Sequence, residues 1–460
     1  MTRFVAVIDL GKTNSKVALV DTHSATEVHV VTQVATINTD TLYPSLDHQA
    51  IEKFVLASLR ALSAEYSIDA ITVTTHGATV ALIDSAGQLV LPVLDYEFSG
   101  VDELRDEYNR HRPAFADTGS PALPGGLNIG AQLYWQQSRF KNQFAHTHTV
   151  LTWPQYWIYR LCGQRCNDVT SLGCHSDLYE PLQQRYSSLV DTMNWRSLMP
   201  PTRHSGQLCG QLRSTIATST GLQTKTPVYT GIHDSNASLV PHLIARNAPY
   251  SVVSTGTWFV AMAMGATPVT LDEYKDTLLN VNAKGESVPS ARFMGGRERE
   301  LLNVSTLANE HTMDRLLVNQ TSPAMLMPSV VTDTGPYPTS SSRWVGADVQ
   351  HDSEMKACVV TLYLALMTHE CMLQIGSCGP TFIEGPLAHD TIYARMLAAV
   401  SQRPVFIGTS QTGTSVGAAM LVSAPEYLPD YEQVRLSEAQ RNRLEHYAAA
   451  WREQLCIHAR

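Results

Sequence analysis

The sequence lacks three features that would assign it to a common class of protein. Its eight cysteines include no C-x-x-C pair of the kind that clamps zinc, so we expect reduced thiols. No apolar run reaches ~18 residues, the length that crosses a membrane, and the first residues lack the apolar core and cleavage site of a signal peptide. From these absences we expect a soluble, cytoplasmic protein with no membrane partner.

Charge is also scarce in this chain. Charged residues make up 16% of it and the net charge is -9, which gives no general attraction for nucleic acid, so no nucleic-acid partner is expected. Cys162, Cys166 and Cys174 lie near His175 in the sequence, but their spacing matches no zinc-ligand pattern. This spacing favours buried or surface thiols over a metal site. The composition does not determine the oligomeric state, and a homodimer is compatible with it.

The length of the chain predicts two domains. A chain of 460 residues exceeds one ordinary hydrophobic core and suggests two domains of roughly 200 residues each, with a cleft between them. We place them at residues 1–245 and 246–460. Alternating strands and helices predict an α/β fold. In the first half they are strands at 4–10, 15–21, 27–36 and 70–77, a helix at 46–66, and an irregular insertion at 85–225.

The second half repeats this order. Residues 250–265 again form two apolar runs around a polar, glycine-containing tip, as residues 4–21 do. Strand and helix patterns then alternate at 353–373, 381–385, 393–400, 404–409 and 415–424. The repetition predicts two copies of one α/β unit.

The two hairpin tips carry groups that suit a phosphate. The first offers backbone N–H groups, hydroxyls and ammonium groups at Lys12, Thr13, Asn14, Ser15 and Lys16. It is no Walker A loop, because that motif requires glycine five residues before Gly11, where the chain has Ala6. Alone, the turn would be read as a solvated hairpin connection. The second tip, with Gly256 and Thr257, favours a paired grip on a polyphosphate.

Two aspartates end or follow core strands and suit different roles. Asp9 is the candidate for Mg²⁺, which takes few protein ligands and keeps much of its hydration shell. Asp234 is the candidate for a base that accepts a hydroxyl proton, although an aspartate at a helix N-terminus is often only a cap. Further polar groups could bind the acceptor, namely His76 with Gly77, Asp95 and His233.

Three blocks of the sequence together resemble the FGGY carbohydrate kinases, nearest to rhamnulokinases and fuculokinases. They are Asp9 to Lys16, Gly231 to Ser235, and Ser254 to Trp258. The resemblance implies two ribonuclease-H-like domains of the actin and hexokinase type, with ATP and sugar meeting in the cleft. It also implies that Asp234 is the general base, that Asp9 assists Mg²⁺, and that Lys12 to Lys16 and Thr257 meet the phosphates. Gly77, His233, Asp234 and Ser235 would border the sugar.

Three segments depart from the family pattern. The adenosine segment reads Glu384-Gly385-Pro386-Leu387-Ala388, in which Gly385 remains the candidate contact to the nucleotide. Lys16 stands where arginine is common in the family. Residues 290–298, which include Gly295-Gly296, replace the family's asparagine-rich approach to a Gly-Gly pair. The expected activity is ATP-dependent phosphorylation of a small ketose such as L-rhamnulose, L-fuculose or a four- or five-carbon ketose. The alternatives are a non-catalytic sugar or nucleotide sensor of the same fold and an actin-like ATPase acting on a protein partner.

Overall fold

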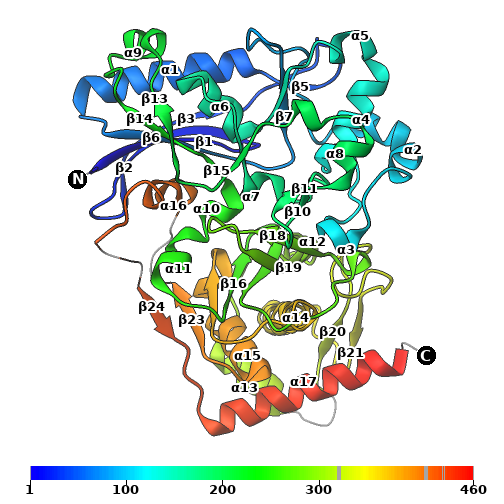
Figure 1. Cartoon of the computed structure of the whole chain (residues 1–460). Helices are drawn as coiled ribbons and strands as arrows, with labels where there is room; N and C mark the ends of the chain where they lie inside the picture. Colours follow the sequence, from blue (N-terminus) through cyan, green and yellow to red (C-terminus); the bar gives the residue numbers. More distant parts are fainter. Residues whose placement is uncertain (1, 319–322, 409–412, 427, 429, 459–460) are drawn as a thin grey trace. The chain divides into compact units, whose positions relative to one another are not determined.

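The computed structural model describes residues 2–318, 323–408, 413–426, 428 and 430–458 (Figure 1). The chain forms two compact units. The first comprises Met1–Arg246, Leu279–Ser287 and Thr412–Leu428, and the second comprises Asn247–Leu278, Val288–Gln411 and Pro429–Arg460. The structure differs from the predicted boundaries of 1–245 and 246–460 because two segments of the second half join the first unit.

The first unit is built on a seven-stranded sheet in the order β13-β14-β6-β1-β2-β3, with β15 also paired to β6. β1 and β6 are parallel, and β1, β2 and β3 form an antiparallel meander. The strands are β1 Phe4–Leu10, β2 Asn14–Asp21, β3 Thr26–Val34, β6 Ala70–Thr75, β13 Leu208–Gln211, β14 Pro227–Tyr229 and β15 Ile232–His233.

Both faces of this sheet are covered, which explains why β1 reads as a continuous apolar run. Ala6, Ile8 and Leu10 share a core with α1 (His48–Glu65) and α6 (Trp153–Cys162). Side chains alternate along a strand, so Asp9 points to the opposite face, where α16 (Thr414–Met420) packs. Figure 1 shows α1 and α16 on the two sides of the sheet.

The predicted insertion at 85–225 is only partly an insertion, because α6 and β13 within it belong to the core of the first unit. Most of the rest consists of short elements around a separate hydrophobic cluster that includes Trp135 and Phe140, while α9 packs against α1. These elements, with the short strands before them, are β4 Ile37–Asn38, β5 Ser45–Leu46, β7 Val80–Ile83, η1 Ser99–Leu104, α2 Arg105–Asn109, α3 Phe115–Thr118, α4 Ile129–Arg139, α5 Lys141–Phe144, β8 Thr149–Thr152, β9 Asn167–Asp168, α7 Val169–Leu172, β10 Tyr179–Glu180, β11 Arg185–Tyr186, α8 Ser188–Thr192, η2 Arg196–Leu198, β12 Thr202–Arg203 and α9 Ser214–Thr220.

The second unit is built on another seven-stranded sheet, in the order β18-β19-β17-β16-β22-β23-β24. β18 starts in this unit and ends in the first. The strands are β16 Tyr250–Thr255, β17 Phe259–Met264, β18 Thr277–Val281, β19 Ser287–Phe293, β22 Thr381–Glu384, β23 Val405–Gly408 and β24 Tyr431–Gln433. The remaining elements are η3 Glu273–Lys275, α12 Gly295–Leu301, α13 Glu310–Val318, β20 Met325–Met327, β21 Arg343–Val345, α14 Ser353–Gln374, η4 Pro386–His389, α15 Thr391–Ser401 and α17 Glu438–His458.

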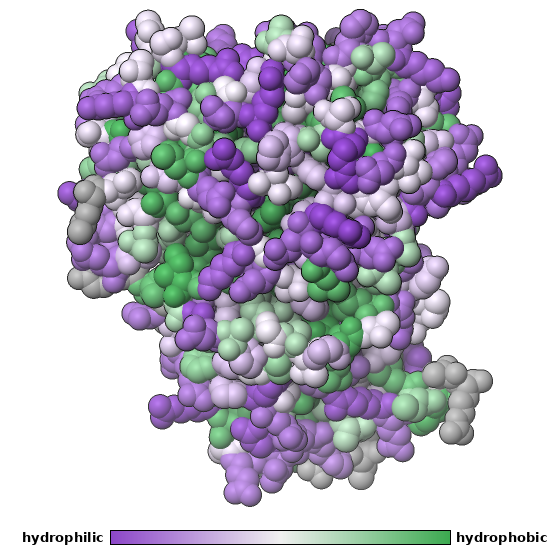
Figure 2. Space-filling model, viewed as in Figure 1, coloured by the Kyte–Doolittle hydropathy of each residue, from purple (hydrophilic) through white to green (hydrophobic). Residues whose placement is uncertain are grey.

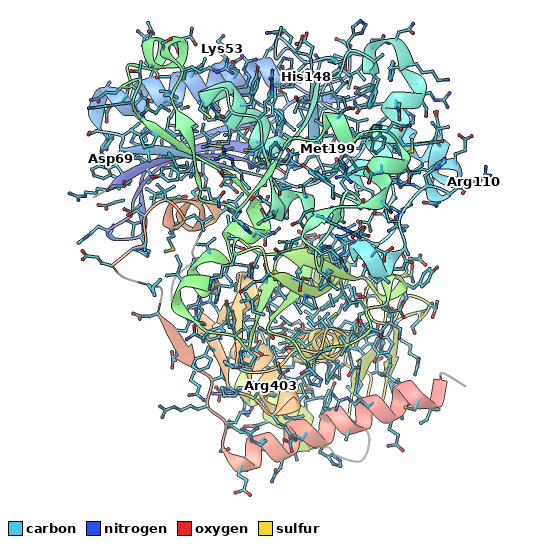
Figure 3. All side chains as sticks on the ribbon, viewed as in Figure 1. Lys53, Asp69, Arg110, His148, Met199 and Arg403 are labelled. Carbon is cyan, nitrogen blue, oxygen red and sulfur yellow. The ribbon has the colours of Figure 1, made fainter. Side chains whose placement is uncertain are left out.

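The core of the second unit surrounds α14, which packs against α15 and β17. In the described part of the chain, α14 is the one helix long and apolar enough to cross a membrane, and 83% of its most apolar window is buried within the protein. A buried core helix meets the same criterion, so α14 is read as one. Hydrophilic residues cover most of the face seen in Figure 2, and Figure 3 shows Lys53 and Arg110 at the outer surface of the first unit.

The predicted strands of both hairpins and the helices at 46–66, 353–373 and 393–400 are confirmed, within a few residues at their ends. The helix predicted at 415–424 corresponds to α16, which follows most of the second unit in the sequence but packs in the first compact unit. There Gly417 packs so closely that an added Cβ would lie 1.9 Å from the Ala237 carbonyl oxygen. Contacts with β1, β6 and α10, whose residues are far apart from the helix in the sequence, place α16 against the first sheet.

Candidate active site

The two candidate aspartates lie at one end of the first sheet, on either side of β6. In the parallel register, Thr74 of β6 pairs with Asp9 on one side and with Ile232 on the other. The chain turns into α10 (Asp234–Ala237) directly after His233. The turn approaches β6 closely, because a Cβ on Gly231 would lie 2.5 Å from the Val73 carbonyl oxygen. The sheet therefore brings together residues that are 225 positions apart in the sequence.

Asp234 is the central residue of this candidate site, and its side chain is 28% exposed. Its carboxylate Oδ1 accepts hydrogen bonds from the backbone N–H of Ser235 at 2.6 Å and from the Ser235 hydroxyl at 3.3 Å. Burial raises the pKa of Asp234 to about 6, the nearby charge of Asp9 raises it too, and His76 and the Ser235 hydrogen bonds oppose the rise. A carboxylate with such a pKa suits proton transfer near neutral pH.

The helix-cap interpretation of Asp234 is not supported by the local geometry. The N-cap residue of α10 is His233, whose side chain makes no capping hydrogen bond, and Asp234 is the first residue within the helix. An N-cap side chain accepts from the N–H two or three residues ahead, whereas Asp234 accepts from its immediate neighbour.

His233 is fixed in place by its neighbours. Its ring Nε2 lies 3.2 Å from Asp234 Oδ1, and its Nδ1 lies 3.2 Å from Asn236 Nδ2. Burial lowers the pKa of His233 to about 4, so the ring is neutral near pH 7. A Cβ on Gly77 would lie 2.9 Å from His233 Nε2, so glycine there makes room for the imidazole. Burial also lowers the pKa of His76.

Asp9 lies in a polar cluster on the α16 face of the sheet. Its Oδ2 accepts hydrogen bonds from Thr414 Oγ1 at 2.5 Å and Ser415 Oγ at 3.2 Å, and Lys16 Nζ lies 3.3 Å away. Burial lowers the pKa of Lys16, but Glu27, 2.9 Å from Nζ, and Asp9 outweigh burial and raise it overall. The ammonium group of Lys16 therefore offsets part of the negative charge of Asp9 and Glu27.

The carboxylate oxygens that Asp9 offers as ligands fit a hydrated magnesium ion. Oδ1 of Asp9 has no hydrogen-bond partner among the residues that the structure describes, because the contacts of the cluster all go to Oδ2. Within the same described ranges, no group of three or more His, Cys, Asp or Glu residues is arranged to hold a metal. Mg²⁺ bound through one carboxylate, water and phosphate oxygens requires no such group.

The structure places Lys12 and Asp95 together, although the sequence assigned them to different ligands. Lys12 Nζ forms a short ion pair with Asp95 Oδ1, lies 3.2 Å from Glu97 Oε2, and sits 4.7 Å from the centre of the Tyr96 ring. The charge of Lys12 is thus already balanced by two carboxylates. Tyr96 in turn packs edge-on against His76, with ring centres 5.4 Å apart, which ties this group to the site.

The remaining residues of the first tip differ in exposure. The turn is closed by a hydrogen bond from the Gly11 N–H to the Asn14 carbonyl at 2.9 Å. Thr13 and Asn14 are exposed at the tip, whereas Ser15 is buried at 1% exposure. The first two are therefore open to a ligand, and Ser15 is held within the sheet.

In the second unit, Gly256 and Gly385 lie on segments that the structure joins. Thr255 Oγ1 donates to the Glu384 carbonyl at 2.7 Å and accepts from the Leu387 N–H at 3.0 Å. Gly385 adopts a φ of 87°, a left-handed conformation that favours glycine. The Gly296 N–H donates to the Thr257 carbonyl at 3.2 Å, so all three glycine-containing segments meet around the exposed tip of Gly256 and Thr257.

Replacing Gly256 with valine tests this tip as a phosphate-binding element. The nearest atom to an added Cβ is the Trp258 carbonyl oxygen at 3.7 Å, so the side chain fits without disturbing the fold. A β-branched side chain would nevertheless obstruct a phosphate that approaches the backbone, so we expect weaker binding of an ATP analogue by calorimetry. Equal affinity in wild type and variant would show that the tip holds no phosphate.

Sequence reasoning missed several residues of the site. Thr414 and Ser415 lie far from Asp9 in the sequence, and Tyr96 and Glu97 adjoin the predicted Asp95. A possible signal for the first pair is the Gly-Thr-Ser sequence that opens a small-residue helix, since hydroxyl groups are common at helix starts. Asn236 and Thr170, which hold His233, carry no distinguishing pattern.

Comparisons with known proteins cover nearly the whole chain. Residues 4–241 match the family described as the FGGY family of carbohydrate kinases, N-terminal domain, and residues 247–430 match its C-terminal domain. The chain is 27% identical over 270 residues to L-fuculokinase of Salmonella typhi, covering 56% of each chain. It is 29% identical over 208 residues to L-fuculokinase of Escherichia coli (strain K12), covering 44% of this chain and 43% of that one. The chain thus matches about half the length of these curated relatives.

Solved structures match over a greater length. A carbohydrate kinase from Novosphingobium aromaticivorans has a TM-score of 0.89 and 33% identity, covering 98% of this chain and 99% of the other. A xylulose kinase from Rhodospirillum rubrum has a TM-score of 0.80 and 20% identity, covering 99% of each chain. The second likeness concerns the fold alone. The predicted fold class, two α/β domains of the sugar-kinase type, is confirmed by these matches.

Proposed function

The chain belongs to the FGGY family of carbohydrate kinases, and we propose that it transfers the γ-phosphate of ATP directly to a hydroxyl of a small sugar with Asp234 as general base. The observation that carries this proposal is the partly exposed carboxylate of Asp234, with its pKa raised by burial to about 6. This carboxylate lies beside a neutral His233, and it lies near enough to Asp9, the magnesium candidate, for the charge of Asp9 to raise its pKa further.

In the proposed reaction, Asp234 accepts the proton of the sugar hydroxyl as that oxygen attacks the γ-phosphorus, while the bond from the γ-phosphorus to the β,γ-bridging oxygen breaks and ADP leaves. No covalent enzyme intermediate is required. The neutral ring of His233 lies 3.2 Å from the carboxylate and limits its orientation without adding a positive charge that would lower its basicity. His76, Gly77, Asp95 and Ser235 are proposed to border the sugar.

ATP and Mg²⁺ are the proposed cosubstrate and metal. Asp9 and its hydroxyl partners Thr414 and Ser415 would hold the hydrated ion, which would offset the negative charge of the phosphates. Lys16, Thr13 and Asn14 of the first tip and Gly256 and Thr257 of the second are proposed phosphate contacts. Gly385 is proposed to lie at the adenosine. Lys12 is the weaker candidate for phosphate because Asp95 and Glu97 already pair with it.

The acid limb of the pH profile is expected to report Asp234. Because its pKa is raised to about 6, the carboxyl is increasingly protonated below that pH and cannot accept a proton. We expect kcat/KM to fall about tenfold per pH unit below roughly pH 6 and to level off above it. The buried His233 has a pKa lowered to about 4 and stays neutral over this range. A profile that stays flat down to pH 5 would contradict the assignment.

The acceptor is proposed to be a small ketose, ranked with L-fuculose, L-rhamnulose and four- or five-carbon ketoses first and with glucose poor. The support is the partial likeness to L-fuculokinases and the compact, buried polar border formed by His76, Asp95 and His233. Such groups, left unpaired by a misplaced hydroxyl, can discriminate up to ~10⁴-fold.

A coupled assay of ADP release over a panel of sugars tests this assignment. The highest kcat/KM for glucose or glycerol, with the ketoses inert, would refute the ketose while leaving the kinase. A complete lack of sugar-stimulated ADP release would refute the kinase itself and favour the sensor.

A further inference from the structure

Two cysteines that are neighbours in the sequence, Cys162 and Cys166, meet the distant Cys209 in the first unit. Cys166 Sγ lies 3.5 Å from Cys209 Sγ, and Cys162 lies close enough to Cys209 for that neighbour to raise the pKa of the Cys162 thiol. Cys166 and Cys209 are buried, at 1% and 8% exposure, while Cys162 is only partly buried and connects the group to the surface. Sequence spacing could not reveal this trio, because 43 residues separate Cys166 from Cys209.

The trio adjoins the two segments whose hydrogen bonds hold the turn that carries Asp234, one at Thr230 and the other at Asp168 to Thr170. On one side, the Thr230 hydroxyl donates to Cys209 Sγ at 3.7 Å, and the Thr230 N–H donates to the Gln207 carbonyl at 2.7 Å. Thr230 is followed directly by Gly231, the residue packed tightly against β6. A displacement of Cys209 is therefore transmitted within a few residues to His233 and Asp234.

On the other side, Cys166 precedes the segment that anchors the backbone of His233. Asp168, fully buried, accepts the Thr170 hydroxyl and the Ser205 hydroxyl, the latter at 2.6 Å. The Thr170 oxygen in turn accepts the His233 N–H at 3.1 Å. Both cysteines thus adjoin hydrogen bonds that hold the turn of Asp234.

We propose that Cys166 and Cys209 form a reversible disulfide that switches off the site carrying Asp234. The role of the switch, though not the disulfide itself, rests on the proposed kinase function. The oxidant is hydrogen peroxide. The Cys209 sulfur attacks one peroxide oxygen, an S–O bond forms and the O–O bond breaks. Cys209 becomes a sulfenic acid, and the other oxygen leaves as water with the thiol proton. The Cys166 thiol then attacks that sulfur, an S–S bond forms, the S–O bond breaks, and a second water leaves.

The surroundings of Cys209 favour it as the attacking thiol. The neighbouring Cys162 and Cys166 thiols lower the pKa of Cys209, burial opposes them, and Thr230 and Arg203 assist them. Redox-sensitive cysteines characteristically combine a stabilised thiolate with a neighbouring resolving thiol. Closing the bond would shorten the distance between the two sulfurs from 3.5 Å to about 2.05 Å, so the two side chains and the segments that carry them would have to adjust.

The test combines peroxide treatment with disulfide mapping in the full chain. Wild type is oxidised with hydrogen peroxide, its free thiols are alkylated, and its peptides are mapped by mass spectrometry. We expect a Cys166–Cys209 cross-link, at least about a tenfold loss of sugar-dependent ADP release, since displacing a catalytic group by 1 Å can cost more than this, and recovery with dithiothreitol. Cys209→Ala should resist the loss, and Cys456→Ala, which removes an exposed cysteine outside the trio, should behave as wild type.

Three outcomes would overturn the proposal. They are the absence of the cross-link, a link from Cys209 to Cys162 instead, and equal inactivation of Cys209→Ala and wild type. Hydrogen exchange of wild type decides the matter if Cys209→Ala does not fold or if no sugar is phosphorylated. Exchange at residues 230–235 should then increase on oxidation, and unchanged exchange there would refute the switch independently of the kinase assignment.

Discussion

Replacing Asp234 with asparagine is expected to lower kcat at least about 100-fold, within the range typical for loss of a positioned base. The amide has nearly the same shape and can still accept the Ser235 hydrogen bonds on its oxygen, so KM for the sugar should change little. The decisive measurement is steady-state ADP release at saturating ATP, Mg²⁺ and sugar.

Asp191→Asn provides the matched control for this substitution. Asp191 forms a surface ion pair with Arg196 at 2.7 Å, and exposed pairs of this kind contribute little to stability. We expect its kcat to equal that of wild type. Near-normal turnover of Asp234→Asn would leave Asp234 without a catalytic role, and a matching loss in Asp191→Asn would point to a general effect of the substitution.

Replacing Asp9 with asparagine is expected to raise the Mg²⁺ concentration for half-maximal activity about 10- to 100-fold, the range seen when a group that orients a metal's ligands is removed. The amide lacks the negative charge that would attract the hydrated ion, while its oxygen can still accept the Thr414 and Ser415 hydrogen bonds. The effect is measured by titrating Mg²⁺ at fixed total ATP.

Asp9→Asn also removes an ion pair of Lys16, which requires its own control. Glu27→Gln removes the other carboxylate partner of the same lysine, 2.9 Å from Nζ, without changing Asp9. An unchanged Mg²⁺ titration in Glu27→Gln, with a shifted one in Asp9→Asn, would support the metal assignment. Equal shifts in the two variants would attribute the effect to Lys16.

The elements closest to Asp9 and Asp234 could be predicted because local patterns specify them. β1 and β2 are apolar runs on either side of a polar tip, and β6 is a continuous buried run. Pairing of residues through the sheet register then placed Asp9 and Ile232 beside the same residue, Thr74.

Contacts between distant segments were not predictable in the same way. Lys12 was assigned to phosphate because its own turn suits an anion, yet the fold brings Asp95 and Glu97 to its ammonium group. The grouping of Cys162, Cys166 and Cys209 was likewise not predictable from the sequence. Cys209 comes close to Cys166 only because its strand, β13, joins the first sheet. Such contacts form only when segments that lie dozens of residues apart come together in the fold, and no local periodicity in the sequence indicates them.

The sequence by itself determined the α/β class, the two hairpin tips, the family resemblance and the choice of Asp9 and Asp234. These follow from the alternation of apolar residues and from short motifs, which act over a few residues. The tertiary structure alone decided that α16 belongs to the first unit, that Thr414 and Ser415 hold Asp9, and that Gly77 makes room for His233. It also decided the raised pKa of Asp234, because burial is a property of the packed site and not of the residue.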